Sequence, residues 1–151
     1  MHRRVIVPAR VNIIGEHTDY ADGIALPFAI DKKLELVIKP LESGFKGEEA
    51  VIAMWQALGG YPAELTITSN IPIGKGMSSS AALCVALTAG LNPNQDKMAI
   101  CLAAQKLEHD ILGTPCGLLD QMAIVYAKEK HVTKINFADL SVEHIRLPES
   151  W

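Results

Sequence analysis

Apolar residues recur along this chain in short runs, and the spacing within each run indicates whether a strand or a helix is expected. Alternation with polar residues, or a short continuous apolar run between turn residues, predicts a strand. Strands are predicted over residues 3–7, 24–30, 34–38, 63–68, 133–137 and 142–147, with a further apolar run over 11–14. We expect Pro8 to end the first strand, Asp31-Lys32 to form a turn, and a hairpin to cross 138–140.

Four segments carry apolar spacing compatible with a helix, and three of them end at helix-breaking residues. They cover residues 46–58, 79–89, 96–112 and 117–127. Glycine or proline follows the first three of them, at Gly59-Gly60, Asn92-Pro93-Asn94 and Gly113-Thr114-Pro115. Strands and helices mix without a strict βαβ alternation, so the sequence predicts one domain of the α+β class.

The composition is that of an ordinary globular domain, with 49% hydrophobic and 21% charged residues in 151. The net charge of −3 gives no support for nucleic-acid or anionic-membrane binding, because both favour clustered Lys and Arg. No segment has the length and hydrophobicity of a membrane span or a signal peptide. The three widely spaced cysteines are expected to be buried thiols in a reducing compartment. We therefore expect a cytoplasmic protein with no nucleic-acid or membrane partner.

The segment IPIGKGMSSSAA, residues 71–82, is the first candidate for chemistry and is called the glycine-serine turn below. Glycines let a backbone fold closely around a bulky anion, and the start of a helix offers free N–H groups and a positive dipole end to it. This combination suits a polyphosphate. The segment is not a Walker A loop, because Gly76 follows Lys75 where that motif needs Ser or Thr. An ordinary serine cap of the following helix is the alternative.

A second group of polar residues follows the apolar run 11–14, at Gly15 to Tyr20, with Arg10 and Asn12 just before it. Glu16 and Asp19 are suited to accept hydrogen bonds from the vicinal hydroxyls of a sugar. His17 and Asp19 can also be read as metal ligands, although no second His stands at helical spacing. A solvated loop is the third interpretation.

Two further carboxylates stand near the third helix break. Asp120 opens a mostly apolar helix, where it is either a general base beside a phosphate site or a charge that complements the helix dipole. Glu108 lies late in the preceding helix. Because Mg²⁺ takes few protein oxygens in addition to phosphate oxygens, one Glu and one Ser are enough to hold it.

These segments occur in the same order in the galactokinase branch of the galacto-, homoserine, mevalonate and phosphomevalonate kinase family, which the chain closely resembles. ARVNIIGEHTDYADG (9–23) resembles the galactokinase signature, PIGKGMSSSAA (72–82) the ATP loop, and GTPCGLLDQ (113–121) the segment with the catalytic aspartate. The resemblance covers essentially the whole chain. It implies the N-terminal kinase domain of the ribosomal protein S5 domain 2-like type, with a mixed sheet packed with helices.

The resemblance also implies ATP-dependent phosphorylation of the anomeric hydroxyl of galactose, or a related sugar, to the sugar 1-phosphate. Asp120 is then the residue that accepts the hydroxyl proton, and Arg10 keeps Asp120 ionised and steadies charge on the phosphoryl group. The implied sugar-binding residues are Glu16, His17, Thr18, Asp19 and Asp120. The implied ATP-binding residues are Gly74, Lys75, Gly76, Met77, Ser78, Ser79 and Ser80, and the implied Mg²⁺ ligands are Ser80 and Glu108.

The chain departs from the family pattern in two respects. Ala9 and Ala21-Asp22 replace residues that are usually Gly and Asn-Gly, which bears on the identity of the sugar. Family members are also considerably longer, so residues 1–151 are interpreted as the N-terminal sugar- and ATP-binding domain with the C-terminal domain absent. This predicts self-association or a complementing C-terminal domain. One alternative is a non-catalytic galactose- and ATP-binding regulator, but the Ser80-Ala81 pair and the retained Arg10, Glu108 and Asp120 argue against such a loss of chemistry. The other alternative is an inactive remnant.

Overall fold

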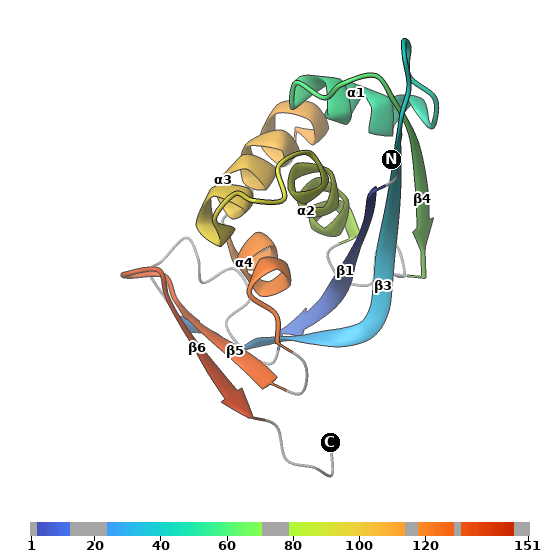
Figure 1. Ribbon diagram of the computed structural model, residues 1–151. Helices are drawn as coiled ribbons and strands as arrows, with labels where there is room; N and C mark the ends of the chain where they lie inside the picture. The colour runs from blue at the N-terminus through green and yellow to red at the C-terminus, as the bar shows by residue number, and fades with distance from the viewer. Residues whose placement is uncertain (1–2, 13–23, 71–78, 114–117, 129–130, 147–151) are drawn as a thin grey trace.

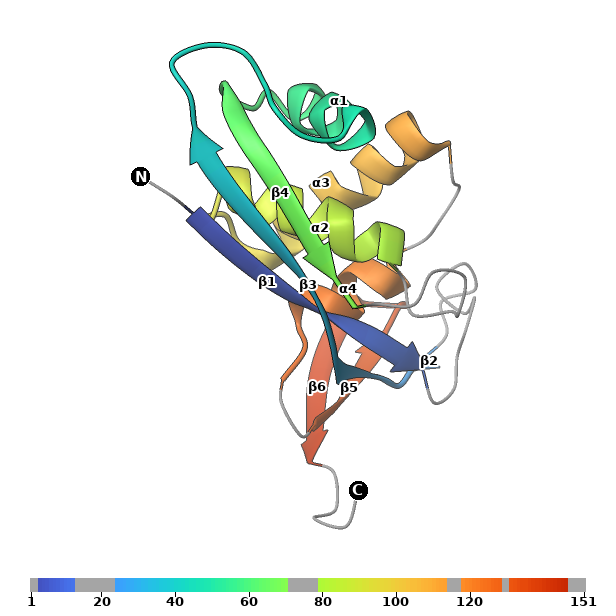
Figure 2. The same cartoon turned by 90° about the vertical axis from the view of Figure 1, so that its right-hand side faces the viewer.

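The computed structural model describes residues 3–12, 24–70, 79–113, 118–128 and 131–146. Within these ranges a six-stranded sheet carries the helices on one face, as Figures 1 and 2 show. The strands are β1 (Arg3–Asn12), β2 (Ile24–Ala25), β3 (Pro27–Pro40), β4 (Ala63–Ser69), β5 (His131–Asn136) and β6 (Ser141–Arg146). The helices are α1 (Glu49–Ala57), α2 (Ser79–Leu91), α3 (Lys97–Leu107), the π-helical turn η2 (Glu108–Leu112) and α4 (Leu119–Val125).

Strand β3 organises the sheet, because it pairs with β1, β4 and β5. Strand β5 extends the sheet to β2 and β6. The ladders between these strands are antiparallel, and an isolated parallel bridge joins Lys46 to Glu64. The expected α+β class is confirmed.

Two of the predicted strand boundaries are wrong, and a single irregularity explains both. Strand β1 continues through Pro8, and β3 continues through Asp31-Lys32 instead of turning there. The register passes from Pro8 opposite Lys33 to Arg10 opposite Ala29, so β3 places extra residues opposite β1 at this point. A bulge of this kind interrupts the hydrogen-bond ladder, so Pro8, which has no N–H donor, is tolerated there. The bulge also bends β3, as Figure 1 shows.

The predicted helices are present with shifted ends. Helix α1 begins at Glu49 and not at residue 46, because the backbone of Lys46 bonds to Ala63 and Leu65 of β4 instead. Asp96 caps α3 by accepting from the N–H of Met98 at 2.9 Å. The predicted hairpin across 138–140 joins β5 to β6, and the predicted strand 63–68 is β4.

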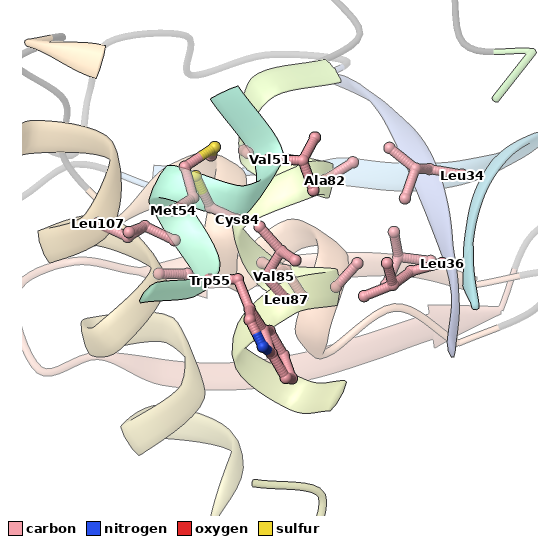
Figure 3. Packing of buried hydrophobic residues seen from close by; sticks show 14 of the residues in the cluster. Leu34, Leu36, Val51, Met54, Trp55, Ala82, Cys84, Val85, Leu87 and Leu107 are labelled. Atoms are coloured by element: carbon pink, nitrogen blue, oxygen red, sulfur yellow. The ribbon is translucent and has the colours of Figure 1, made fainter. Parts of the chain in front are cut away.

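Helix α2 forms the centre of the core because it is apolar on nearly every side. It packs against β1, β3, α1, α3 and α4. Figure 3 shows its side chains meeting Met54 and Trp55 of α1 and Leu36 of β3, all of which are wholly or almost wholly buried. Each such side chain contributes about 1.5–3 kcal/mol relative to exposure. The core thereby holds the first turn of α2 in a defined place relative to the other helices.

Two of the cysteines, Cys84 and Cys101, are buried thiols outside any disulfide, as expected, and burial raises the pKa of the Cys101 thiol to about 12. Cys116 lies outside the described residues. None of the helices in the described ranges has the length and apolar character needed to traverse a lipid bilayer.

Gly60→Ala is expected to lower the free energy of unfolding by about 1–3 kcal/mol, because the core around Trp55 has no room for a methyl group. A Cβ at Gly60 would lie 2.4 Å from Cε2 and Nε1 of Trp55. The indole is wholly buried and its Nε1 donates to the Tyr61 carbonyl at 2.8 Å, so the ring is not free to move aside. Urea unfolding at equilibrium measures the change.

A double-mutant cycle with Trp55→Phe is the control for this prediction. Phe has a single six-membered ring in place of the larger indole and lacks Nε1, so it relieves part of the overlap. We expect a coupling energy of at least about 0.5 kcal/mol between the two changes. Strictly additive costs would show that contact with the indole is not the cause.

Candidate functional site

Three segments that are distant in the sequence meet where α2 begins, where α3 passes into η2, and where α4 begins. Helices α2, α3 and α4 pack on one another beside the sheet, and η2 contacts α2 (Figure 1). The last four residues of the glycine-serine turn, 79–82, form the start of α2. The junction therefore places Ser80, from the candidate phosphate-binding segment, beside Glu108, with Asp120 close enough to act electrostatically on Glu108.

Glu108 is buried at the first position of η2, with 3% of its surface exposed, whereas its neighbours His109 and Asp110 are exposed. The helix changes here from α to π geometry and ends at Gly113, which adopts a left-handed φ of 64°. A π turn accommodates an extra residue and redirects the side chains around it, and such turns are frequent at functional sites. The amphipathic segment 96–112 is thus helical as predicted, but its last turn has a geometry that periodicity does not reveal.

Each carboxylate oxygen of Glu108 is bonded to a different helix. The Ser80 hydroxyl of α2 donates to Oε2 at 3.3 Å, and the Gln121 amide of α4 donates Nε2–H to Oε1 at 2.8 Å. Ser80 stands 28 positions and Gln121 13 positions from Glu108 in the sequence. The carboxylate therefore links all three segments of the junction.

The pKa of Glu108 lies above its ordinary value, chiefly because burial penalises the charge and secondly because Asp120 places a like charge nearby. The hydrogen bonds from Ser80 and Gln121 oppose this rise, as does His109. A cation beside Glu108 would offset both the burial and the repulsion from Asp120. The electrostatics of the junction therefore favour a bound positive charge.

The oxygen atoms present at the junction suit magnesium. Proteins hold Mg²⁺ by one or two carboxylates, and waters and substrate phosphates complete its octahedron. The Glu108 carboxylate and the Ser80 hydroxyl form such a minimal set beside the glycine-serine turn. No group of three or more His, Cys, Asp or Glu side chains gathers as a metal site in the ranges that the structure describes.

Asp120 lies in the first turn of α4, partly buried, and its charge acts on Glu108. Helix α4 packs against β1, the strand that contains Arg10, and the backbone of Arg10 pairs with Ala29. The side chains of Arg10 and Ser79 are not among those described. The remaining predicted site residues, Glu16, His17, Thr18, Asp19, Gly74, Lys75, Gly76, Met77 and Ser78, lie outside the described residues.

Gln121 is the residue at this junction that sequence reasoning missed. The sequence does contain a signal for it, because Gln121 is the polar residue that follows Asp120 in the otherwise apolar run 118–125. A buried amide in such a run is expected to have a specific hydrogen-bond partner. The sequence does not reveal which residue that partner is.

Two family models match the chain. The model described as "GHMP kinases N terminal domain" matches residues 45–128, which is more than half of the chain. The model described as "Galactokinase galactose-binding signature" matches residues 3–40. Ser80, Glu108 and Asp120 fall in the first match, and Arg10 falls in the second.

Curated relatives match almost the whole chain. The galactokinase of Thermotoga maritima is 33% identical over 172 residues, and the match covers 95% of this chain and 49% of that protein. The galactokinase of Thermococcus kodakarensis is 32% identical, with 97% and 50% covered. The chain thus spans about half the length of the curated relatives it matches.

Solved structures share the fold. The galactokinase of Lactococcus lactis, solved in complex with galactose, superposes with a TM-score of 0.81 at 25% identity, over 97% of this chain and 47% of that one. The mevalonate kinase of Methanococcus jannaschii gives a TM-score of 0.72 at 19% identity, over 97% and 56%. The predicted N-terminal kinase domain of the ribosomal protein S5 domain 2-like type is confirmed.

Proposed function

Because this chain belongs to the GHMP kinase family, we propose that it is the sugar- and nucleotide-binding half of an ATP-dependent galactose kinase. The proposed reaction transfers the γ-phosphoryl group of ATP to the anomeric hydroxyl of galactose or a closely related sugar. The observation that carries the proposal is the junction of α2, η2 and α4, where Ser80, Glu108 and Asp120 come together at the end of the glycine-serine turn. Galactose is supported by the galactose-binding signature and by the galactose complex of the Lactococcus lactis relative.

The nucleotide part of the proposal rests on the start of α2. The N–H groups in the first turn of a helix have no partner within the helix, and the positive end of the dipole of the 13-residue α2 lies at this point. Gly74, Lys75, Gly76, Met77, Ser78, Ser79 and Ser80 would surround the ATP phosphates. Ser80 and Glu108 would hold Mg²⁺, which when bound neutralises charge on the β- and γ-phosphates.

The chemical part of the proposal assigns Asp120 to the anomeric hydroxyl. Phosphoryl transfer depends on positioning and charge stabilisation more than on covalent chemistry. Asp120 would orient the hydroxyl and accept its proton, and Arg10 would counter the charge of Asp120 and of the transferred group. The placement of α4 against β1 supports this pairing. Glu16, His17, Thr18 and Asp19 would bind the sugar hydroxyls.

We also propose that a C-terminal half completes the active site, either in the same protein or as a complementing partner. Self-association of this chain is the alternative. Size-exclusion chromatography with light scattering distinguishes a monomer from a self-associated form.

The proposal is tested by titrating the purified 151-residue chain with galactose and with Mg·ATP in a calorimeter. Galactose-dependent release of ADP is measured in the same preparation, and galactose 1-phosphate is identified by mass spectrometry. We expect binding of both ligands and weak turnover by this chain alone, increasing when a C-terminal half is supplied.

A sugar panel with galacturonate, arabinose and N-acetylgalactosamine decides the substrate. If one of these sugars binds more tightly than galactose, that sugar becomes the proposed substrate, and the protein remains a proposed sugar kinase. If neither ATP nor any of the sugars binds, the proposal is wrong.

A further inference from the structure

Gln121 is the most deeply buried polar side chain of the junction, with no exposed surface. Its neighbours Leu119, Met122, Ala123 and Ile124 are apolar and pack in the core. A buried amide loses its hydrogen bonds to water, so it is favoured over an apolar side chain only where it gains specific partners. Gln121 is therefore better explained by a polar contact than by packing alone.

That contact is the hydrogen bond from Nε2 of Gln121 to Oε1 of Glu108, at 2.8 Å. It is shorter than the bond from Ser80 to Oε2, at 3.3 Å. Nε2 is a donor, so the bond stabilises the ionised carboxylate rather than its protonated form. The carboxylate is thus held firmly at Oε1, from the α4 side, and more loosely at Oε2, from the α2 side.

We propose that Gln121 is a positioning residue for the magnesium site: by holding Oε1 of Glu108, it keeps Oε2 directed toward Ser80, where the cation binds. This inference rests on the proposed function, because Ser80 and Glu108 are the ligands assigned there. Groups that hydrogen-bond to metal ligands orient them, and loss of such a group typically costs about 10–100-fold in metal affinity. Gln121 directly follows Asp120, so the same first turn of α4 would place the reacting carboxylate and orient the metal-binding one.

The alternative is that Gln121 only fills space in the core. Gln121→Met separates the two possibilities, because Met has a similar length and volume but no donor. A packing role predicts normal metal binding in this variant. The positioning role predicts that Mn²⁺, used as a probe for Mg²⁺, binds about 10–100-fold more weakly in the presence of a non-hydrolysable ATP analogue.

The readout is the free Mn²⁺ signal in electron paramagnetic resonance, which does not depend on turnover. Galactose affinity and metal-free nucleotide affinity are measured alongside and should not change. Gln121→Asn is the second variant, because its shorter amide does not reach Glu108 but disturbs the core differently. Gln121→Asn should also weaken Mn²⁺ binding. If the Met variant does not fold, the Asn variant decides between the packing role and the positioning role.

Thr133→Val is the matched control. Thr133 is buried to 1% exposure in β5, and its hydroxyl has no hydrogen-bond partner in the part of the chain that the structure describes. The change also replaces a buried polar group by an apolar isostere, but outside the junction, and should leave Mn²⁺ binding unchanged.

The possible results distinguish a failure of the positioning role of Gln121 from a failure of the proposed kinase function. Wild-type affinity for Mn²⁺ in the folded Gln121 variants would overturn the positioning role and leave the kinase proposal intact. If the wild-type chain binds no Mn²⁺ with nucleotide, the magnesium assignment itself fails, and the positioning role fails with it. Equal weakening in Thr133→Val would show that the effect is general softening of the core, and would also overturn the inference.

Discussion

Asp120→Asn is expected to reduce galactose-dependent ADP release by about 10²–10⁴-fold, the range typical of removing a positioned acid–base group. Asn keeps the size of Asp and its place in the first turn of α4, but it does not accept a proton. Galactose affinity should change little, because the other sugar-binding residues remain. The measurement uses whichever form of the protein, with or without a C-terminal half, gives the higher release of ADP.

Asp110→Asn is the matched control for this prediction. Asp110 is an exposed carboxylate in η2 that accepts from Lys106 at 2.7 Å, so the same chemical change is made near the junction but on its outer surface. This control should retain wild-type turnover. Unchanged turnover in Asp120→Asn would remove Asp120 from the chemistry, and a loss of galactose binding would assign it to sugar recognition instead.

Glu108→Gln is expected to have opposite effects on stability and on function. In the metal-free protein, Gln removes a buried charge that Asp120 repels, so the free energy of unfolding should rise. The amide also preserves both hydrogen bonds, because its oxygen accepts from Gln121 and its nitrogen donates to Ser80. Loss of the carboxylate should weaken Mn²⁺ binding by more than about 100-fold, beyond the cost of losing an outer-shell partner.

The stability effect should depend on pH with a defined sign. The pKa of Glu108 is raised in the folded state, so folding favours its protonated form. Its contribution to wild-type stability is therefore fully present below the pKa of Glu108 in the unfolded chain, near 4.5. That contribution is lost as the pH rises through the pKa of Glu108 in the folded protein. Glu108→Gln has no such loss. Its gain in free energy of unfolding over the wild type should therefore be absent below the unfolded-chain pKa and should grow toward neutral pH.

Urea unfolding between pH 4 and 8, with and without Mg·ATP, measures both effects. At about 100 times Kd, a ligand stabilises the native state by about 2.7 kcal/mol, so Mg·ATP should make the wild type the more stable of the two proteins. Glu143→Gln, which neutralises an exposed carboxylate on β6, should show neither effect. A pH-independent difference between Glu108→Gln and the wild type would contradict the burial argument.

The strand predictions show where local patterns fail. Pro8 and Asp31-Lys32 are strong local signals for a strand end and a turn. In the fold they stand near the register shift between β1 and β3, where the strands pass an irregularity without stopping. Their local preferences are satisfied by the bulge, so a signal that ends an isolated strand only bends one that is paired on both sides of that signal.

The candidate site shows the same difference between what local patterns predict and what tertiary contacts decide. The residue types of the glycine-serine turn, Glu108 and Asp120 predict phosphate, magnesium and proton chemistry, because these chemistries require particular side chains at particular places along the chain. Gln121 was not predicted as a site residue, because nothing in its neighbours identifies the carboxylate it contacts. The π turn at Glu108 was not predicted either, since the same residues fit an ordinary helix.

The sequence alone determined the α+β class, the order of the three motifs and the family resemblance, because apolar periodicity and motif spacing are properties of neighbouring residues. Only the tertiary structure decided that β3 is continuous, that the last turn of 96–112 is π-helical, and that Glu108 is shared between Ser80 and Gln121. These features depend on contacts between residues that are far apart in the chain. Such contacts exist only once α2 is buried against the sheet and brings the three segments together.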